Sequence, residues 1–164
     1  MMRRRQPDST MQGLLDRQAV IDTVSRMCCA FDEQDWPALR ACLADALDTD
    51  YSRFRGTPPA RLAADEFVRL RQVGLAGLRT QHLSFNHLVE VTGERACCRC
   101  DFIIHRWPVE QADPRFFHTY GFYRYEFVRV VEGWRICGIT QFVLRSDGSP
   151  ELHGAHRPVD APAP

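Results

Sequence analysis

Three residues of the chain have side chains suited to moving protons at neutral pH. His82 and His105 lie in apolar, strand-like runs, and Asp32 lies on the apolar face of the first predicted helix. An imidazole titrates near neutrality, so two of them with one carboxylate in an apolar pocket would form a proton-transfer site. Their order along a short chain therefore predicts a small acid–base enzyme that needs no cofactor.

Each of these residues also has a structural interpretation. Asp32 could be a solvated residue in the last turn of its helix, where the helix dipole disfavours a carboxylate. Its place within the apolar stripe, rather than opposite it, favours a function. His82 alone would more often be a core residue with satisfied hydrogen bonds, and His105 is equally open to either interpretation.

The remaining histidines are weaker candidates. His87 is separated from His82 by an odd number of residues, so a regular strand would place it on the other face of the sheet. We expect it to be structural. His118 begins a long strand and is undecided, whereas His153 and His156 are expected to be solvated in a C-terminal tail.

Composition excludes several classes of function. The chain has 21 basic and 21 acidic residues and a formal net charge of zero, and every basic residue is an arginine. Without lysine, Schiff-base and pyridoxal phosphate chemistry are excluded. No net field favours nucleic acid or an anionic membrane, and no run approaches the roughly 18 apolar residues that span a bilayer. We expect a cytoplasmic protein with a small-molecule substrate, and neither a nucleic acid nor a membrane as partner.

The cysteines do not predict a metal site. There are seven, an odd number, which does not indicate a disulfide framework. In Cys97-Cys98-Arg99-Cys100 the last two cysteines share one face of a strand, and no second ligand pair follows at zinc spacing. We therefore expect these thiols to be packed in the core, and we expect neither a metal nor a cofactor.

The periodicity of the chain predicts one domain over residues 13–147, between a disordered arm (1–12) and a flexible tail (148–164). Apolar residues at helical spacing predict helices over about 15–34 and 64–75. Asp35 followed by Pro37 predicts the N-cap and first turn of a second helix that runs to Leu43. Residues 47–54 form a short strand or extended segment.

Later residues are extended. Runs rich in β-branched and aromatic residues over 80–92, 95–106, 116–131 and 134–145 predict long strands separated by turns. Helices followed by an antiparallel meander predict an α+β fold in which a curved sheet wraps over a helix layer. Such a cone can enclose an apolar pocket.

The chain resembles the nuclear-transport-factor-2-like (NTF2-like) superfamily, in its SnoaL-like and scytalone-dehydratase-like branch. The resemblance covers about residues 14–145 and implies a cone-shaped roll with an apolar pocket. It rests on the order and spacing of six segments: Leu15-Asp16-Arg17-Gln18-Ala19-Val20-Ile21-Asp22, Phe31-Asp32-Glu33-Gln34-Asp35-Trp36, Asp50-Tyr51-Ser52-Arg53-Phe54, Ala64-Asp65-Glu66-Phe67-Val68, Leu78-Arg79-Thr80-Gln81-His82 and Glu132-Gly133-Trp134-Arg135-Ile136.

The resemblance also implies roles for individual residues. His82 and Asp32 match a histidine–aspartate pair that moves the protons of an elimination, and His105 matches a second histidine. Tyr51 matches one of two tyrosines that hold a water against the substrate carbonyl.

The match is incomplete around the substrate. The second tyrosine falls on Phe31, which has no hydroxyl, and a pocket asparagine falls near Tyr123. We expect both residues to contact the substrate, together with Phe54 and Asn86.

These assignments predict a dehydratase, a lyase that eliminates water from a hydroxy-carbonyl compound of polyketide-like secondary metabolism. His82, oriented by Asp32, would remove the proton, Tyr51 would polarise the carbonyl, and His105 would hold or protonate the leaving hydroxyl. The alternatives are an isomerase or cyclase of a polyketide or steroid-like compound in the same pocket, and a ligand-binding module without turnover. A sheet this rich in aromatic residues also predicts a homo-oligomer, a dimer or trimer.

Overall fold

The computed structural model describes residues 11–153 of the chain, apart from the side chain of Arg55. The described residues form four helices: α1 (Met11–Glu33), α2 (Trp36–Ala41), α3 (Ser52–Arg55) and α4 (Ala64–Gly74). The first two strands lie between α2 and α4 in the chain, and a short 3-10 helix, η1 (Pro150–Leu152), follows the last strand. The expected arm (1–12) and tail (148–164) lie largely outside the described residues. His156 lies outside them as well.

A single sheet of six strands forms the body of the protein. Its strands are β1 (Leu43–Asp50), β2 (Ala60–Ala63), β3 (Leu78–Thr92), β4 (Arg95–Pro108), β5 (Phe117–Val130) and β6 (Gly133–Gly148). The strand order is β2-β1-β6-β5-β4-β3. The expected α+β cone is thus found, but the sheet is mixed, because β1 runs parallel to β6.

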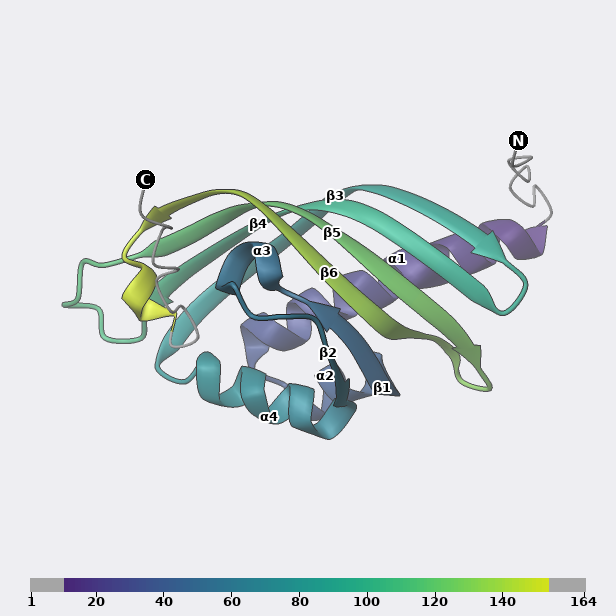
Figure 1. Ribbon diagram of the computed structural model, residues 1–164, viewed down its shortest axis with the longest axis horizontal. Helices are drawn as coiled ribbons and strands as arrows, with labels where there is room; N and C mark the ends of the chain where they lie inside the picture. Colours follow the sequence, from purple (N-terminus) through teal and green to yellow (C-terminus); the bar gives the residue numbers. More distant parts are fainter. Residues whose placement is uncertain (1–10, 154–164) are drawn as a thin grey trace.

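The sheet curves over the helices (Figure 1). Helix α1 lies along its concave face and packs mainly against β3, while α2 and α4 close one end beneath β1 and β2. The apolar stripe of α1 supplies Val20, Val24, Met27 and Phe31 to one continuous core. Burying this stripe against the sheet provides much of the stability of a domain of this size.

The turn into α2 forms as the sequence predicts. Asp35 accepts a hydrogen bond from the backbone amide of Ala38 through Oδ1 (2.9 Å), and Pro37 stands in the first turn. This cap fixes the angle between α1 and α2.

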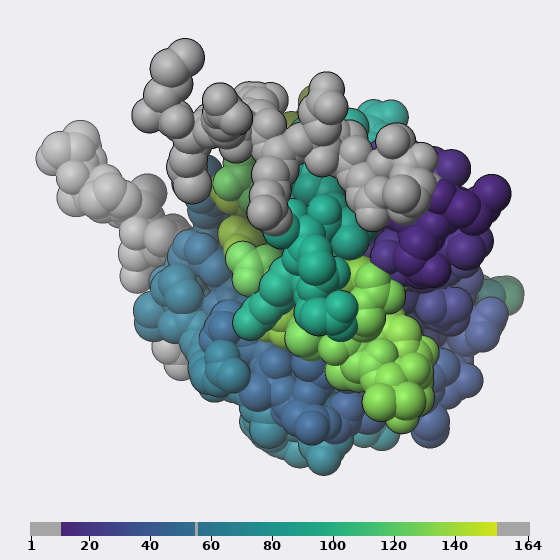
Figure 2. All heavy atoms as spheres, turned by 90° about the vertical axis from the view of Figure 1, so that its right-hand side faces the viewer, coloured from purple at the N-terminus to yellow at the C-terminus, as the bar shows by residue number. Residues whose placement is uncertain are grey.

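The opposite end of the molecule is formed by the β3–β4 and β5–β6 turns beside the start of α1, which is purple in Figure 2. The Arg129 backbone amide donates to the carbonyl of Glu94, joining the two hairpins (3.0 Å). The Arg129 guanidinium pairs with both oxygens of Asp16 on α1 at 2.9 and 2.6 Å, and Trp134 Nε1 donates to the same carboxylate. These contacts fasten α1 to the sheet.

Four expectations from the sequence need correction. The strand β2 was not predicted, and residues 51–54 are a tyrosine followed by a helical turn rather than a continued strand. Strand β6 reaches Gly148, and η1 follows it, so the folded part extends beyond 147. His153 at its end is only 5 % exposed, not solvated as expected.

The face assigned to His87 was wrong because β3 contains a bulge. Three steps from Phe85 to Leu88 on β3 oppose two steps from Asp101 to Arg99 on β4, and Asn86 adopts a φ of +55°. The extra residue returns His87 to the face of His82, where it pairs with the Ser84 hydroxyl (2.8 Å).

Candidate active site

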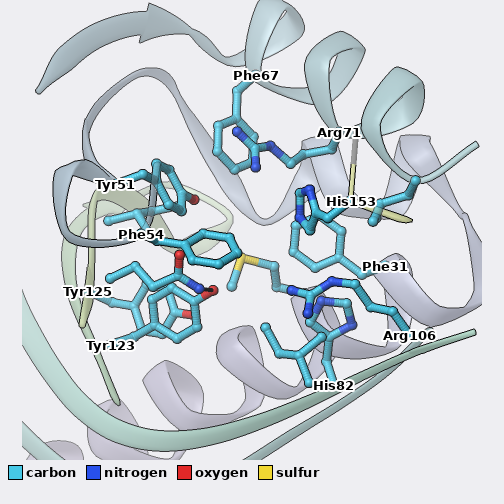
Figure 3. Close-up of a pocket in the computed structure, with 15 residues that line it drawn as sticks. Phe31, Tyr51, Phe54, Phe67, Arg71, His82, Arg106, Tyr123, Tyr125 and His153 are labelled. Atoms are coloured by element: carbon cyan, nitrogen blue, oxygen red, sulfur yellow. Dashed lines mark hydrogen bonds between the residues drawn. The ribbon is translucent and has the colours of Figure 1, made fainter. Parts of the chain in front are cut away.

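A pocket that is partly open to solvent lies between the concave face of the sheet, α1 and α4 (Figure 3). Its empty space is about 470 Å³ when the open mouth is included. The side chains that line it are Met27, Phe31, Tyr51, Phe54, Phe67, Arg71, Leu75, His82, Ile104, Arg106, Tyr123, Tyr125, Ile139, Gln141 and His153. The lining is largely apolar and aromatic, with a few polar groups, as is typical of a small-molecule site.

The structure brings Asp32 and His82 together at one wall of this pocket. His82 Nδ1 lies 2.6 Å from Asp32 Oδ1, within the expected hydrogen-bonding range. The carboxylate also accepts hydrogen bonds from the His82 backbone amide (2.8 Å) and from the Thr80 hydroxyl (2.9 Å). With three donors around it, the Asp32 carboxylate is held in one orientation and orients the imidazole in turn.

The end of α1 places the carboxylate against β3. Gln34, with a φ of +54°, ends the helix, and its side-chain amide donates to the carbonyl of Leu78 at the start of β3 (3.0 Å). Because Thr80 and His82 are two residues apart on β3, both present their polar groups to Asp32. The pair therefore depends on this one helix–strand junction.

Burial lowers the pKa of His82, and the positive charge of Arg106 lowers it further, while the hydrogen bond and charge of Asp32 oppose them. The imidazole is consequently neutral at neutral pH. Since Nδ1 donates its proton to Asp32, Nε2 carries the lone pair and faces the pocket. A neutral imidazole oriented by a carboxylate is the arrangement of a general base.

Aromatic residues hold the imidazole and form the opposite wall. The ring of Phe31 stacks on that of His82 with 5.0 Å between centroids. Tyr123 lies across the pocket from Arg106 in Figure 3, whereas Tyr51 is next to Arg71, whose guanidinium carbon lies 5.0 Å from the Tyr51 ring centroid. Phe31, Tyr51, Phe54 and Tyr123 thus line the pocket, as the sequence predicts.

The Tyr123 hydroxyl is available as a hydrogen-bond donor in the pocket. Its hydroxyl accepts a hydrogen bond from Gln141 Nε2 at 2.6 Å, so its own hydrogen is available to another acceptor. Burial raises the pKa of Tyr123, which keeps the phenol protonated. The Tyr123 hydroxyl can therefore donate to a carbonyl oxygen in the pocket.

His105 does not belong to this site. On β4 the side chains of Ile104 and Arg106 point inward, so His105 points to the outer face of the sheet. There its ring contacts those of Trp107 (5.4 Å) and His118 (4.4 Å). The expectation that His105 faces the cavity was wrong.

Asn86 is also outside the pocket. It occupies the bulge of β3, is exposed, and donates to Asp101 Oδ2 at 2.7 Å. Its left-handed conformation suits asparagine, which explains the residue structurally.

Sequence reasoning missed four polar side chains of the pocket: Arg71, Arg106, Gln141 and His153. Arg106 could have been found, because Cys98, Cys100, Phe102 and Ile104 form an alternating apolar series that it continues. His153 carried no such signal, because it follows the last strand in a short segment that has no periodic apolar pattern.

Within residues 11–153, no three His, Cys, Asp or Glu side chains are grouped so that they could hold a metal ion. No helix in that part of the chain combines the length and apolar character needed to cross a membrane.

The chain belongs to the SnoaL-like domain family, whose model matches residues 12–140. No curated protein sequence matches it significantly. Among solved structures, the Kfla4162 protein from Kribbella flavida is similar, with 22% identity, a TM-score of 0.78, and 87% and 97% of the two chains covered.

Two further structures carry names that indicate chemistry. A hexachlorocyclohexane dehydrochlorinase (LinA) type 2 is 16% identical with a TM-score of 0.69, over 90% of this chain and 97% of that one. A Novosphingobium aromaticivorans protein provisionally named a scytalone dehydratase is 15% identical with a TM-score of 0.72, over 83% and 89% of the chains. At these identities the likeness shows the NTF2-like fold alone.

Proposed function

We propose that the protein is a cofactor-independent lyase, a dehydratase that eliminates water from a small polyketide-like hydroxy-carbonyl compound. One observation carries this proposal: a neutral His82, bound through Nδ1 to Asp32, lines a largely apolar pocket and has Nε2 left to act as a base. The names of the two structural neighbours, a dehydrochlorinase and a dehydratase, are consistent with elimination chemistry.

In the proposed reaction, His82 Nε2 removes a proton from the carbon beside the carbonyl. The electron pair of that C–H bond moves into an enolate and then forms the carbon–carbon double bond as the β C–O bond breaks. The imidazolium returns the proton to the departing hydroxide, which leaves as water. Asp32 stabilises the transient imidazolium, the usual role of a carboxylate behind a catalytic histidine.

The enolate oxygen needs a hydrogen-bond donor as negative charge develops. Tyr123, whose hydroxyl already accepts from Gln141, supplies one, and Tyr51 lines the same pocket. Donors placed where charge develops in a site that excludes water give a large share of a rate enhancement.

A second candidate is an isomerase or cyclase of an enolisable compound. The outward position of His105 removes the group that was expected to assist the leaving hydroxyl. A single base that takes a proton from one carbon and returns it to another needs no such group.

The test uses a panel of cyclic β-hydroxyketones and unconjugated enones, followed by proton NMR in D2O. Elimination yields an enone with loss of water, isomerisation yields a conjugated enone of unchanged mass, and a non-catalytic module yields neither. His82→Ala should abolish turnover and exchange at the carbon beside the carbonyl, while His105→Ala should retain both. Equal activity of the two variants would contradict the proposal.

A further inference from the structure

Two arginines that the proposed reaction does not use line the pocket. Arg71 comes from α4 and Arg106 from β4, and Arg106 lies across the pocket from Tyr123 (Figure 3). Among the described residues that line the pocket, none is an aspartate or glutamate. The nearest acidic participant, Asp32, is engaged behind His82. The cavity is therefore cationic.

Among the described residues Arg71 has no acidic partner, and aromatic rings hold it in position. Its guanidinium carbon lies 5.0 Å from the ring centroid of Tyr51 and 4.8 Å from that of Phe67. Its Nε is buried and has no hydrogen-bond partner among the residues the structure describes. Stacking between aromatic rings fixes the plane of a guanidinium while leaving its N–H edge free to bind.

A purely structural role does not explain Arg71. A basic residue in the last turn of a helix complements the helix dipole, but an arginine with only this role extends into water. Here the side chain turns into the pocket, where its unpaired donor has an energetic cost unless a ligand accepts from it.

Arg106 contributes a second cation that is more deeply buried. Its side chain is held by a hydrogen bond from Nη1 to the Thr119 hydroxyl (3.1 Å), and the residue is only 3 % exposed. The charge of Arg106 already lowers the pKa of His82, so the two groups are electrostatically coupled. An anion near Arg106 would thus lie close to the base.

Among the described residues of the pocket, Gln141 offers an unsatisfied acceptor. Gln141 is 2 % exposed, and its Oε1 has no hydrogen-bond partner among the described residues, whereas its Nε2 is bound to Tyr123. A ligand hydroxyl or N–H would satisfy this oxygen.

We propose that the pocket takes a small organic acid, whose carboxylate binds Arg71 and Arg106 and whose hydroxyl donates to Gln141. This inference deepens the proposed function, and it rests on that function only in calling the bound acid a substrate. The planar guanidinium edge matches the two oxygens of a carboxylate. A carboxylate is favoured over a phosphate because none of the described residues that line the cavity is a glycine, so no glycine-rich loop is there to wrap a phosphate.

The experiment measures binding of benzoate, benzamide and inorganic phosphate to the full chain by calorimetry and by ligand-observed NMR. Benzoate and benzamide have nearly the same shape and differ in charge. Benzoate should bind at least ten times more tightly than benzamide, and phosphate should not compete with it. Arg71→Gln should weaken benzoate binding on the order of 10- to 100-fold and leave benzamide unchanged, the loss expected for one charged hydrogen bond.

Arg69→Gln is the matched control, because Arg69 is on the same helix but pairs with Glu66 on the surface. It changes the net charge equally and should leave benzoate binding intact. Equal binding of benzoate and benzamide, displacement by phosphate, or equal effects of the two arginine variants would overturn the inference.

Comparing benzoate binding with turnover by the native protein separates the two proposals. Arg71-dependent benzoate binding without turnover of any acid by the native protein would refute the lyase function and leave the carboxylate site in place. Turnover of neutral hydroxyketones by a native protein that does not bind benzoate would support the lyase function and refute the carboxylate site.

Discussion

The carboxylate of Asp32 holds both the side chain and the backbone of His82: Oδ1 lies 2.6 Å from Nδ1, and Oδ2 accepts from the backbone amide at 2.8 Å. A residue from the end of α1 thereby fixes both the ring orientation and the strand that carries it. A change at Asp32 should consequently alter the base itself more than the shape of the pocket.

Replacing Asp32 by Asn should lower the maximal rate and move the acidic limb of the pH–rate profile to lower pH. Asp32 raises the pKa of His82 against the lowering effect of burial, so removing its charge lowers that pKa further. Activity falls as pH drops through the pKa of the base, because only the neutral imidazole accepts a proton. His82→Ala should lose about a hundredfold or more.

Steady-state rates from pH 4 to 9 check this prediction. Asp22→Asn, on an exposed part of α1, is the control and should leave the acidic limb in place. An unchanged limb in Asp32→Asn, with a folded protein, would show that the two residues do not act together.

Thr80 is a positioning residue for the same carboxylate. Thr80→Val keeps the branched shape but removes the hydroxyl that donates to Asp32 at 2.9 Å. A net hydrogen bond of about 1 kcal/mol corresponds to roughly a fivefold fall in kcat/KM. Circular dichroism should show an unchanged fold, and Thr92→Val, at the exposed end of β3, should have no effect on kcat/KM.

The layers of the fold were predictable because each has a clear periodicity. The apolar stripe of α1 and the long alternating strands identified the helix layer and the sheet. The parallel pairing of β1 with β6 was not predictable, because it joins residues about 90 positions apart with no local turn to indicate it. The short β2 has too few residues for a periodic signal.

The predictions for His105 and Asn86 were both wrong because of how side chains alternate along a strand. Alternation along a strand decides which side chains face a pocket. In β4 the alternating apolar residues Cys98, Cys100, Phe102 and Ile104 place Arg106 inside and His105 outside. In β3 the alternation itself is interrupted at Asn86. The contact between Asp32 and His82 was predictable, because helix periodicity placed Asp32 on the apolar face of its helix and the resemblance paired it with His82.

We predict a homo-oligomer that buries the outer face of the sheet. Leu83, Phe85, Trp107 and Phe116 are each 37–40% exposed, and large apolar side chains exposed near one another mark an interaction surface. Light scattering at micromolar concentration should give a dimer or trimer. Phe85→Glu should dissociate it, whereas Val131→Glu, in the exposed β5–β6 turn, should not. A monomeric native protein would refute this prediction.

Asp16 should contribute to the stability of the fold in a pH-dependent way. Hydrogen bonds from Arg129 hold its pKa below the usual value, although burial opposes them. A carboxylate with a lowered pKa stabilises the folded state above its unfolded pKa, and this contribution is lost as pH falls through the folded pKa. Asp16→Asn, which cannot pair ionically with Arg129, should lower the free energy of unfolding by about 1–3 kcal/mol at pH 7.

Urea unfolding of both proteins between pH 7 and pH 2 measures this difference. The gap between native protein and Asp16→Asn should narrow below the ordinary carboxylate pKa near 3.8, because the native Asp16 then becomes protonated as well. Catalytic rates of the folded variant should stay near the native value. Asp16 lies near the start of α1, beside the β3–β4 and β5–β6 turns, and does not line the pocket. A gap that stayed constant down to pH 2 would show that Asp16 acts through packing and not through its charge.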